Sequence, residues 1–527
     1  MSVKTVDVAE DFARGGFFLI LGNIISIVVS AISVFIVARI LGPEKYGLYS
    51  ISIIVPSLLS LFLKMGINEG TIKQLASFKV KGEEGKIANL LIQILSFKFL
   101  LGLIVTVVCF VFSDYFATNL FHRPEMGYYI QISSLLIVFQ EVFLILNSFF
   151  IGSDKTQFNA MMTDVQAVFK ATISASLVIL GLGIFGALAG HVASYIVACS
   201  IGVIIFWYKL YKPLRRRQGI KVEFLENLKF LIRYGFPIYL SALLGGFSIQ
   251  YQNILLAIFT SNEAIGNFNA AMNFTVLIAI FSIPIEKLLL SAFSKMESQE
   301  EKMQRFFKFS VKYISMMILP LVTLLLIYSS DIVTLIYGEN YRTAGFFLSL
   351  SLIQYFLIGF GSIVIANFFN GIGETKLSFR ISLVRTAMLA FSAPLLTWAF
   401  KVTGLIIAVF LSSILSNFYG LSIAKSRFNV EIQAEKIAKI YVVSLSSAIP
   451  LLALQRIVFL PSLFQLLLGA SVYLVSYLTV TPLMGIITRN ELKEVKNILD
   501  KVRPLKVLTR PIFYCEEKIL SAVSPKN

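Results

Sequence analysis

Residues 149–156, FFIGSDKT, recur 219 positions later as residues 368–375, FFNGIGET. The same offset relates two further pairs of segments, PEKYG at 43–47 with NEAIG at 262–266, and ARGGF at 13–17 with IRYGF at 232–236. One constant register over this length of chain indicates an internal duplication. Because homologous membrane halves usually face each other across a substrate path, the repeat predicts a transporter.

The composition is too apolar for a water-soluble protein, which could not bury this much apolar surface. Hydrophobic residues make up 57% and charged residues only 14%, whereas soluble domains carry about a quarter charged residues. The apolar segments are about 20–26 residues long, enough for a helix to cross the hydrocarbon core, and they lack the alternation of a barrel strand. We therefore predict an all-α polytopic membrane protein. The first segment is too long for a cleavable signal peptide and follows a charged stretch that includes Asp7 and Glu10.

About fourteen segments are expected to span the membrane. They cover approximately 16–41, 47–67, 88–113, 127–152, 160–181, 184–208, 233–259, 265–292, 311–337, 344–370, 376–400, 403–424, 438–458 and 462–486. The first six and the next six form the two repeats. Because six is an even number, both repeats enter the membrane from the same side, so they are parallel and related by an axis along the membrane normal.

The predicted domains follow from these spans. We expect an N-lobe, a basic cytoplasmic linker, a C-lobe, two additional C-terminal spans and a cytoplasmic amphipathic tail at 1–208, 209–232, 233–424, 425–486 and 487–527. The two lobes should surround a central cavity. For the tail, an interfacial helix and a solvated terminal helix are both open.

Basic residues in the loops predict the orientation. Loops on the side of the N-terminus hold Lys79, Lys81 and the basic run 209–217, and the asymmetry over all loops and tails is about sevenfold. Both termini should therefore be cytoplasmic, in a multi-pass protein of the cell membrane. The net charge of +17 is then a topology signal and a contact with anionic lipid headgroups, which excludes nucleic acid as a partner.

The chain carries no recognisable catalytic or metal-binding motif. The glycine-containing run 371–376 lacks the loop length and the preceding strand of a phosphate-binding loop. The cysteines and histidines are scattered and do not form a disulfide framework or a metal site: Cys109, Cys199, Cys515, His122 and His191. We therefore expect a protein that is not an enzyme and has no cofactor, apart from a coupling ion, Na+ or H+.

Charged residues inside the spans are the candidate functional residues, because charges are expensive in hydrocarbon and normally face a cavity or pair with one another. In the functional interpretation, cationic side chains point into a central cavity and bind an anionic headgroup: Arg39, Lys64, Lys98, Lys170 and Arg385. In the alternative, Glu141 and Asp164 neutralise Lys98 and Lys170 as packing pairs, and Lys64 reaches the membrane interface.

Two further roles are left open. Glu141 or Asp164 is a candidate site for the coupling ion. Pro237 and the pair Gly245–Gly246 form a candidate hinge, because proline removes an intrahelical hydrogen bond; the alternative for the glycines is close helix packing.

Several stretches resemble one family, the polysaccharide biosynthesis flippases of the multidrug/oligosaccharidyl-lipid/polysaccharide exporter superfamily. They are ARILGPEKYGLY at 38–49, LKMGI at 63–67, FNGIGETK at 369–376 and GLIIA at 404–408. The resemblance implies two six-helix bundles around a cavity, alternating access, and movement of a lipid-linked oligosaccharide from the cytoplasmic to the outer leaflet, driven by an ion gradient. The sugar and pyrophosphate would cross in the cavity while the polyprenyl tail stays in lipid.

The sequence also departs from the family pattern. Lys64 stands where relatives often carry an acidic residue. Asn253 stands near a position that is commonly aspartate. If that aspartate couples cations in the relatives, its replacement argues against a coupling site at this position here. Two other functions compete: a cation-coupled multidrug exporter, and a membrane glycosyl or phosphoglycosyl transferase. We expect a monomer, because fourteen helices can form a complete path in one chain.

Overall fold

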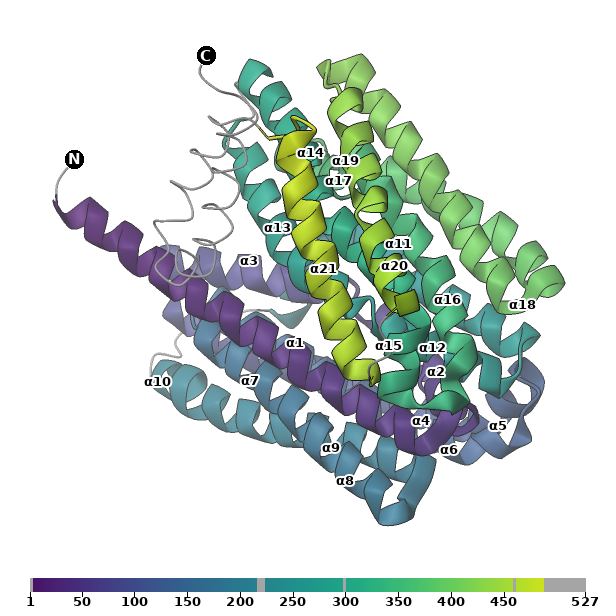
Figure 1. Ribbon diagram of the computed structural model, residues 1–527. Helices are drawn as coiled ribbons and strands as arrows, with labels where there is room; N and C mark the ends of the chain where they lie inside the picture. The colour runs from purple at the N-terminus through teal and green to yellow at the C-terminus, as the bar shows by residue number, and fades with distance from the viewer. Residues whose placement is uncertain (1–2, 216–222, 297–299, 458–460, 488–527) are drawn as a thin grey trace. The chain divides into compact units, whose positions relative to one another are not determined.

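Helices account for every regular element in the described part of the protein. The computed structural model describes residues 3–215, 223–296, 300–457 and 461–487 (Figure 1). The long helices of the first half of the chain are α1 (Val3–Ser52), α2 (Ile54–Leu63), α3 (Ile67–Val80), α4 (Glu84–Val111), α6 (Gly127–Gly152), α7 (Thr156–Phe169), α9 (Gly183–Phe206), α11 (Phe224–Phe259) and α12 (Asn262–Asn273).

The second half continues with helices of similar length. They are α13 (Val276–Ser294), α14 (Glu300–Ile327), α15 (Ser329–Tyr337), α16 (Arg342–Leu352), α17 (Ser362–Gly371), α18 (Thr375–Phe428), α19 (Ala434–Ser446), α20 (Ala448–Ile457) and α21 (Ser462–Leu483). Short helical turns join them: α5 (Ser113–Tyr115), η1 (Phe116–Leu120), η2 (Pro124–Met126), η3 (Lys170–Ser174), α8 (Ala175–Leu177), η4 (Val178–Leu182), η5 (Trp207–Tyr211), α10 (Lys212–Arg215), η6 (Glu339–Tyr341) and η7 (Ile353–Phe360).

Eleven helical runs in the described residues are long and apolar enough to cross a membrane. The predicted class, an all-α multi-pass membrane protein, is confirmed. Three runs are longer than one crossing requires, at 36, 59 and 54 residues. Each contains a residue whose φ is positive and not helical: Gly42 (φ 73°), Gly181 (φ 87°) and Lys401 (φ 55°). These are the places where the predicted pairs of spans meet, although the count of fourteen stays a prediction.

Two compact units make up the chain. The first comprises residues 1–276, 336–343 and 382–412, and the second comprises 277–335, 344–381 and 413–527. The predicted lobe boundaries stay a prediction. Part of the predicted linker and nearly all of the predicted tail lie outside the described residues.

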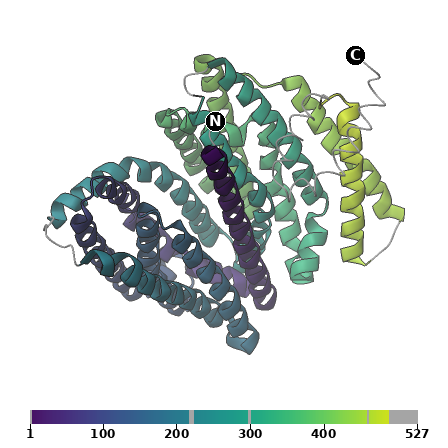
Figure 2. The ribbon, with the colours of Figure 1, turned by 90° about the vertical axis from the view of Figure 1, so that its left-hand side faces the viewer.

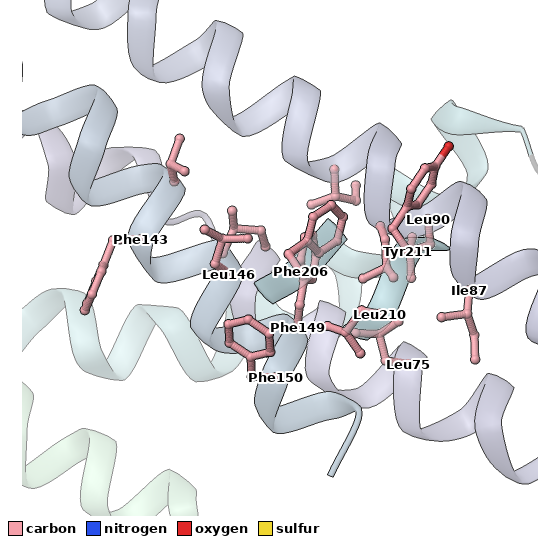
Figure 3. Close-up of a cluster of buried hydrophobic side chains, with 14 of the residues drawn as sticks. Leu75, Ile87, Leu90, Phe143, Leu146, Phe149, Phe150, Phe206, Leu210 and Tyr211 are labelled. Carbon is pink, nitrogen blue, oxygen red and sulfur yellow. The ribbon is translucent and has the colours of Figure 1, made fainter. Parts of the chain in front are cut away.

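Within the first unit, α4, α6, α7 and α9 pack side by side (Figure 2). Their shared core is a cluster of buried aromatic and aliphatic side chains, in which the rings of Phe149 on α6 and Phe206 on α9 stack at 5.6 Å between centroids (Figure 3). Gly102 lets α4 approach α6 closely, since a Cβ there would lie 3.1 Å from the Val138 Cα. Close packing of this kind holds membrane helices together, because lipid tails are as apolar as the core.

In the second unit, the C-terminal helices pack on α14. The Tyr473 hydroxyl donates to the Ser444 carbonyl at 3.0 Å, and the Ser444 and Thr323 hydroxyls are 3.0 Å apart. Tyr328, Leu451 and Tyr473 form a small buried cluster beside them. Helices α19, α20 and α21 therefore belong to the body of this unit.

The aromatic cluster predicts a test of the packing. We expect Phe206→Ala to lower the free energy of unfolding by about 3–5 kcal/mol, because a fully buried ring leaves a cavity that the neighbouring helices only partly fill. Phe110→Ala, at a ring on α4 that is 47% exposed, is the matched control and should change little. Thermal unfolding in detergent measures both; equal midpoints for the two variants would contradict the assignment of this cluster as the core.

Candidate functional site

A pocket lined by both polar and apolar side chains lies inside the first unit. Its volume is about 320 Å³, and it is lined by α2, α6, α9 and α11. The lining residues are Ser57, Ser60 and Leu61 of α2, Lys64, Gln140, Phe143 and Leu144 of α6, Tyr195 of α9, and Gly246 and Gln250 of α11. We call this cavity the Lys64 pocket.

Lys64 is presented to the pocket by a break in the second predicted span. Helix α2 ends at Leu63, and the chain turns through Met65 (φ 47°) and Gly66 (φ 76°) before α3 begins at Ile67. Glycine adopts a positive φ freely, whereas methionine does so rarely. A Cβ on Gly66 would overlap the backbone of Gly235 in α11, so this turn also requires glycine for the close approach of that helix.

Neutral polar groups surround the lysine. The amides of Gln140 and Gln250 and the hydroxyls of Ser57 and Ser60 supply donors and acceptors, and the Tyr195 ring lies beside Gln140. Amides and hydroxyls match the hydroxyl groups of a sugar, whereas a lysine ammonium binds a phosphate as a point charge. The pocket therefore combines one cation with neutral hydrogen-bonding groups and with an apolar part formed by Leu61, Phe143 and Leu144.

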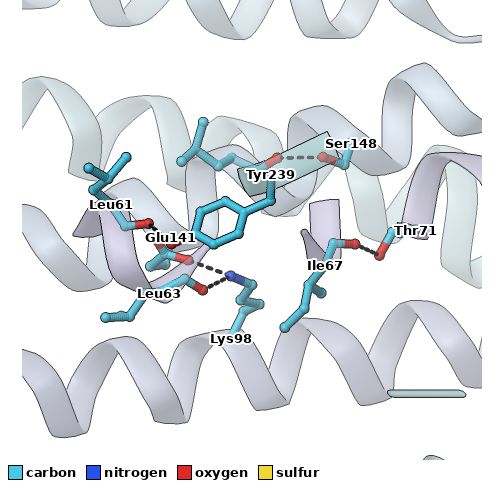
Figure 4. A network of polar contacts seen from close by, with 9 residues as sticks. Leu61, Leu63, Ile67, Thr71, Lys98, Glu141, Ser148 and Tyr239 are labelled. Atoms are coloured by element: carbon cyan, nitrogen blue, oxygen red, sulfur yellow. Dashed lines mark hydrogen bonds and ion pairs between the residues drawn. The ribbon is translucent and has the colours of Figure 1, made fainter. Parts of the chain in front are cut away.

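An ion pair is buried directly beside the pocket. Lys98 of α4 and Glu141 of α6 are both 0% exposed, and Lys98 Nζ lies 2.7 Å from Glu141 Oε2 (Figure 4). Removing two charges from water is costly unless they are paired and hydrogen-bonded. This arrangement matches the predicted alternative, in which Glu141 neutralises Lys98 as a packing pair.

The ion pair also supports the break after α2. Lys98 Nζ donates a second hydrogen bond, of 2.7 Å, to the Leu63 carbonyl, and the Tyr239 hydroxyl of α11 donates to the Leu61 carbonyl at 3.1 Å (Figure 4). The last carbonyls of a helix have no partner within the helix. Lys98 and Tyr239 supply those partners, so two other helices, α4 and α11, hold the end of α2 in place.

The other predicted cationic residues lie elsewhere. Arg39 is exposed, and its Nη1 donates to the Ile336 carbonyl at 3.1 Å. Lys170 is half-buried in η3 and faces His191 of α9, whose ring is 5.8 Å from that of Tyr195 in the pocket wall. Arg385 lies exposed in α18. Of the five cations, Lys64 lines the pocket, and the binding roles of all five stay predictions.

The remaining candidates are placed as follows. Asp164 is half-buried in α7. Helix α11 runs without a break through Pro237, Gly245 and Gly246. Gly246 packs against Leu61, since a Cβ there would lie 2.7 Å from Leu61 Cδ1, whereas a Cβ on Gly245 would meet nothing within 4 Å. The ion-coupling and hinge roles stay predictions, and the described residues contain no group of three or more His, Cys, Asp or Glu suited to a metal.

Charge alone did not identify the pocket wall. The candidate residues were predicted from charges inside the spans. Because Gln140, Gln250 and Tyr195 are neutral, they were not predicted. Uncharged amides inside apolar spans are also costly to bury without partners, so the glutamines at 140 and 250 were a usable signal.

A family model described as "Polysaccharide biosynthesis protein" matches residues 36–345. The chain belongs to this family. It is 20% identical over 347 residues to the lipopolysaccharide biosynthesis protein WzxC of Escherichia coli K12, covering 63% of this chain and 65% of that protein. It is also 20% identical over 266 residues to the probable low-salt glycan biosynthesis flippase Agl15 of Haloferax volcanii, covering 50% of this chain and 56% of that protein. The matches thus span less than two thirds of these relatives.

A solved structure supports the same fold. The lipid II flippase MurJ in an inward closed conformation superimposes with a TM-score of 0.70 and 17% identity, over 88% of this chain and 99% of that chain. The family model therefore confirms the predicted family. Membership of this family and the superposition on MurJ together confirm the predicted fold.

The buried ion pair predicts a non-additive effect on stability. We expect Lys98→Met and Glu141→Met each to lower the free energy of unfolding by about 3–5 kcal/mol, because each leaves a buried partner without its countercharge and its hydrogen bond. The double variant Lys98→Met/Glu141→Met should lose less than either single change. Thermal unfolding in detergent tests this cycle, and strictly additive losses would mean that the two side chains do not interact.

Proposed function

We propose that this protein is a flippase that moves a polyprenyl-(pyro)phosphate-linked oligosaccharide from the cytoplasmic to the outer leaflet of the cell membrane by alternating access. The observation that carries the proposal is the Lys64 pocket, which places one cation among amides, hydroxyls and apolar side chains, inside a member of the polysaccharide biosynthesis family. Membrane lipids and the lipid-linked sugar are the partners, and the protein acts as a monomer with both termini in the cytoplasm.

The chemistry of the pocket supports a glycan headgroup. Lys64 attracts the phosphate, and Gln140 and Gln250 exchange hydrogen bonds with sugar hydroxyls in place of water. A cationic drug would be repelled by Lys64, so the multidrug-exporter alternative is less well supported. Transport, and not catalysis, is the role proposed, in line with the description of Agl15 as a probable flippase and of MurJ as a lipid II flippase.

The other cations and carboxylates have proposed roles that rest on charge. Arg39, Lys170 and Arg385 contact the anionic headgroup at other stages of its passage, and Lys98 does so only after it separates from Glu141. Either Glu141 or Asp164 binds the coupling ion, Na+ or H+. Support for Glu141 comes from its second carboxylate oxygen, Oε1, which is buried and makes no hydrogen bond within the described residues. Bending of α11 near Pro237, Gly245 and Gly246 accompanies the change of state.

Reconstitution tests the function directly. Proteoliposomes carrying a polyprenyl-pyrophosphate oligosaccharide should transfer it between leaflets, faster when a proton or sodium gradient is imposed. The same vesicles loaded with a cationic dye are the control for the drug-exporter alternative. Absence of glycolipid transfer together with gradient-driven dye efflux would overturn the proposal.

Variants of the pocket lysine test the site. We expect Lys64→Ala to slow glycolipid transfer by about 10- to 100-fold, because a hydrogen bond to a charged group contributes about 1.5–3 kcal/mol. Lys81→Ala, at an exposed lysine of the loop between α3 and α4, is the matched control. Lys64→Arg keeps the charge and should retain much of the rate. Normal transfer by a folded Lys64→Ala protein would remove Lys64 from the binding site.

A further inference from the structure

The two repeats touch at positions that correspond to each other. Gly47 of α1 lies against the backbone of Asn262, where α12 begins, and a Cβ on Gly47 would overlap the Asn262 carbonyl oxygen. Gly266 of α12 lies against the backbone of Pro43, and a Cβ there would overlap the Pro43 carbonyl oxygen. All four residues belong to the first unit. We call this contact the glycine crossing.

The crossing obeys the internal duplication. The offset of 219 residues relates Pro43 to Asn262 and Gly47 to Gly266. Gly47 packs on Asn262, and its equivalent Gly266 packs on Pro43, the residue equivalent to Asn262. The two contacts are therefore related by a local two-fold axis. Backbone meets backbone here, so both positions tolerate only a hydrogen as side chain.

An arginine reinforces the crossing from outside the two helices. Arg123, in the turn before η2, donates through Nε to Asn262 Oδ1 at 2.6 Å and through Nη2 to the Thr260 carbonyl at 2.7 Å. Its Nη1 donates to the carbonyls of Ala257 and Phe121. The guanidinium thus satisfies the terminal carbonyls of α11 and holds the side chain of a residue that forms the crossing.

The crossing lies at one end of the helices that line the Lys64 pocket. Ser57 is ten residues beyond Gly47, and Gln250 is nine residues before the end of α11 at Phe259. At 1.5 Å per helical residue, each is about 15 Å from the crossing. In the predicted orientation, this end is the non-cytoplasmic one.

We propose that the glycine crossing is the gate that closes the transport path on the non-cytoplasmic side, and that it separates when the pocket opens to that side. At the crossing backbone packs on backbone, and beside it the Asn273 amide of α12 donates to the Tyr46 hydroxyl of α1 at 3.0 Å. Separation of the two helices therefore breaks the backbone contact, this hydrogen bond and the Arg123 hydrogen bonds. Any larger residue at 47 or 266 keeps the gate from closing. This inference rests on the proposed alternating access, but its test needs no substrate and fails independently of the transport assay.

Accessibility labelling tests the gate. Ser57→Cys, in a background with Cys109, Cys199 and Cys515 replaced, reports on the pocket when a membrane-impermeant maleimide is added from the non-cytoplasmic side. We expect Gly47→Ala and Gly266→Ala each to raise the labelling rate at least about tenfold, equivalent to a shift of about 1.4 kcal/mol between states. Lys81→Ala, at an exposed lysine of the loop between α3 and α4, is the control and should label at the parent rate.

Arg123→Gln provides a second variant that adds no volume at the crossing. It should raise labelling in the same direction, and Arg123→Lys should restore part of the protection. Parent-level labelling in folded Gly47→Ala, Gly266→Ala and Arg123→Gln proteins would overturn the gate. If the glycine variants fail to fold, parent-level labelling of folded Arg123→Gln would assign the crossing to static packing and overturn it as well.

Discussion

The buried contact of Lys98 with Glu141 and with the Leu63 carbonyl is the constraint on which the pocket depends. Desolvating two charges costs several kcal/mol for each ion unless they are paired and hydrogen-bonded, so α4 and α6 must place these groups together. The same ammonium satisfies the end of α2 at 2.7 Å. The position of Lys64, one residue beyond Leu63, follows from that attachment, because the chain can turn into the pocket only where the helix has been ended and its carbonyls satisfied.

The pocket and the glycine crossing lie on the same helices. The segment from α1 to α2 carries Gly47 and Ser57, and α11 carries Gln250 and leads to Asn262. Separation at one end of these helices must therefore move the lining of the pocket. At the crossing backbone packs on backbone, so one added methyl group at either glycine is enough to hold the helices apart.

Much of the fold was predictable. Hydrophobic segment lengths predicted a multi-pass helical protein, and the motifs around Pro43–Gly47 and Asn370–Thr375 predicted the family. The site was less predictable. The sequence predicted five cations as candidates for the cavity lining, and of these five Lys64 lines the pocket. Gln140, Gln250 and Tyr195 were missed because neutral polar residues in an apolar span look the same whether they face a cavity, a neighbouring helix or their own backbone.

The sequence alone determined that the protein lies in a membrane, that it contains an internal duplication and which family it resembles. These properties depend on composition, segment length and residues close together in the chain. The tertiary structure decided which charge meets which. Lys98 and Glu141 are 43 residues apart, and Lys98 and Leu63 are 35 apart; their contact depends on how each helix is rotated about its axis and how closely glycines allow the helices to approach. It also decided that the repeated Gly47 and Gly266 pack on each other's neighbours, since the register of a repeat says which residues are equivalent and not which ones touch.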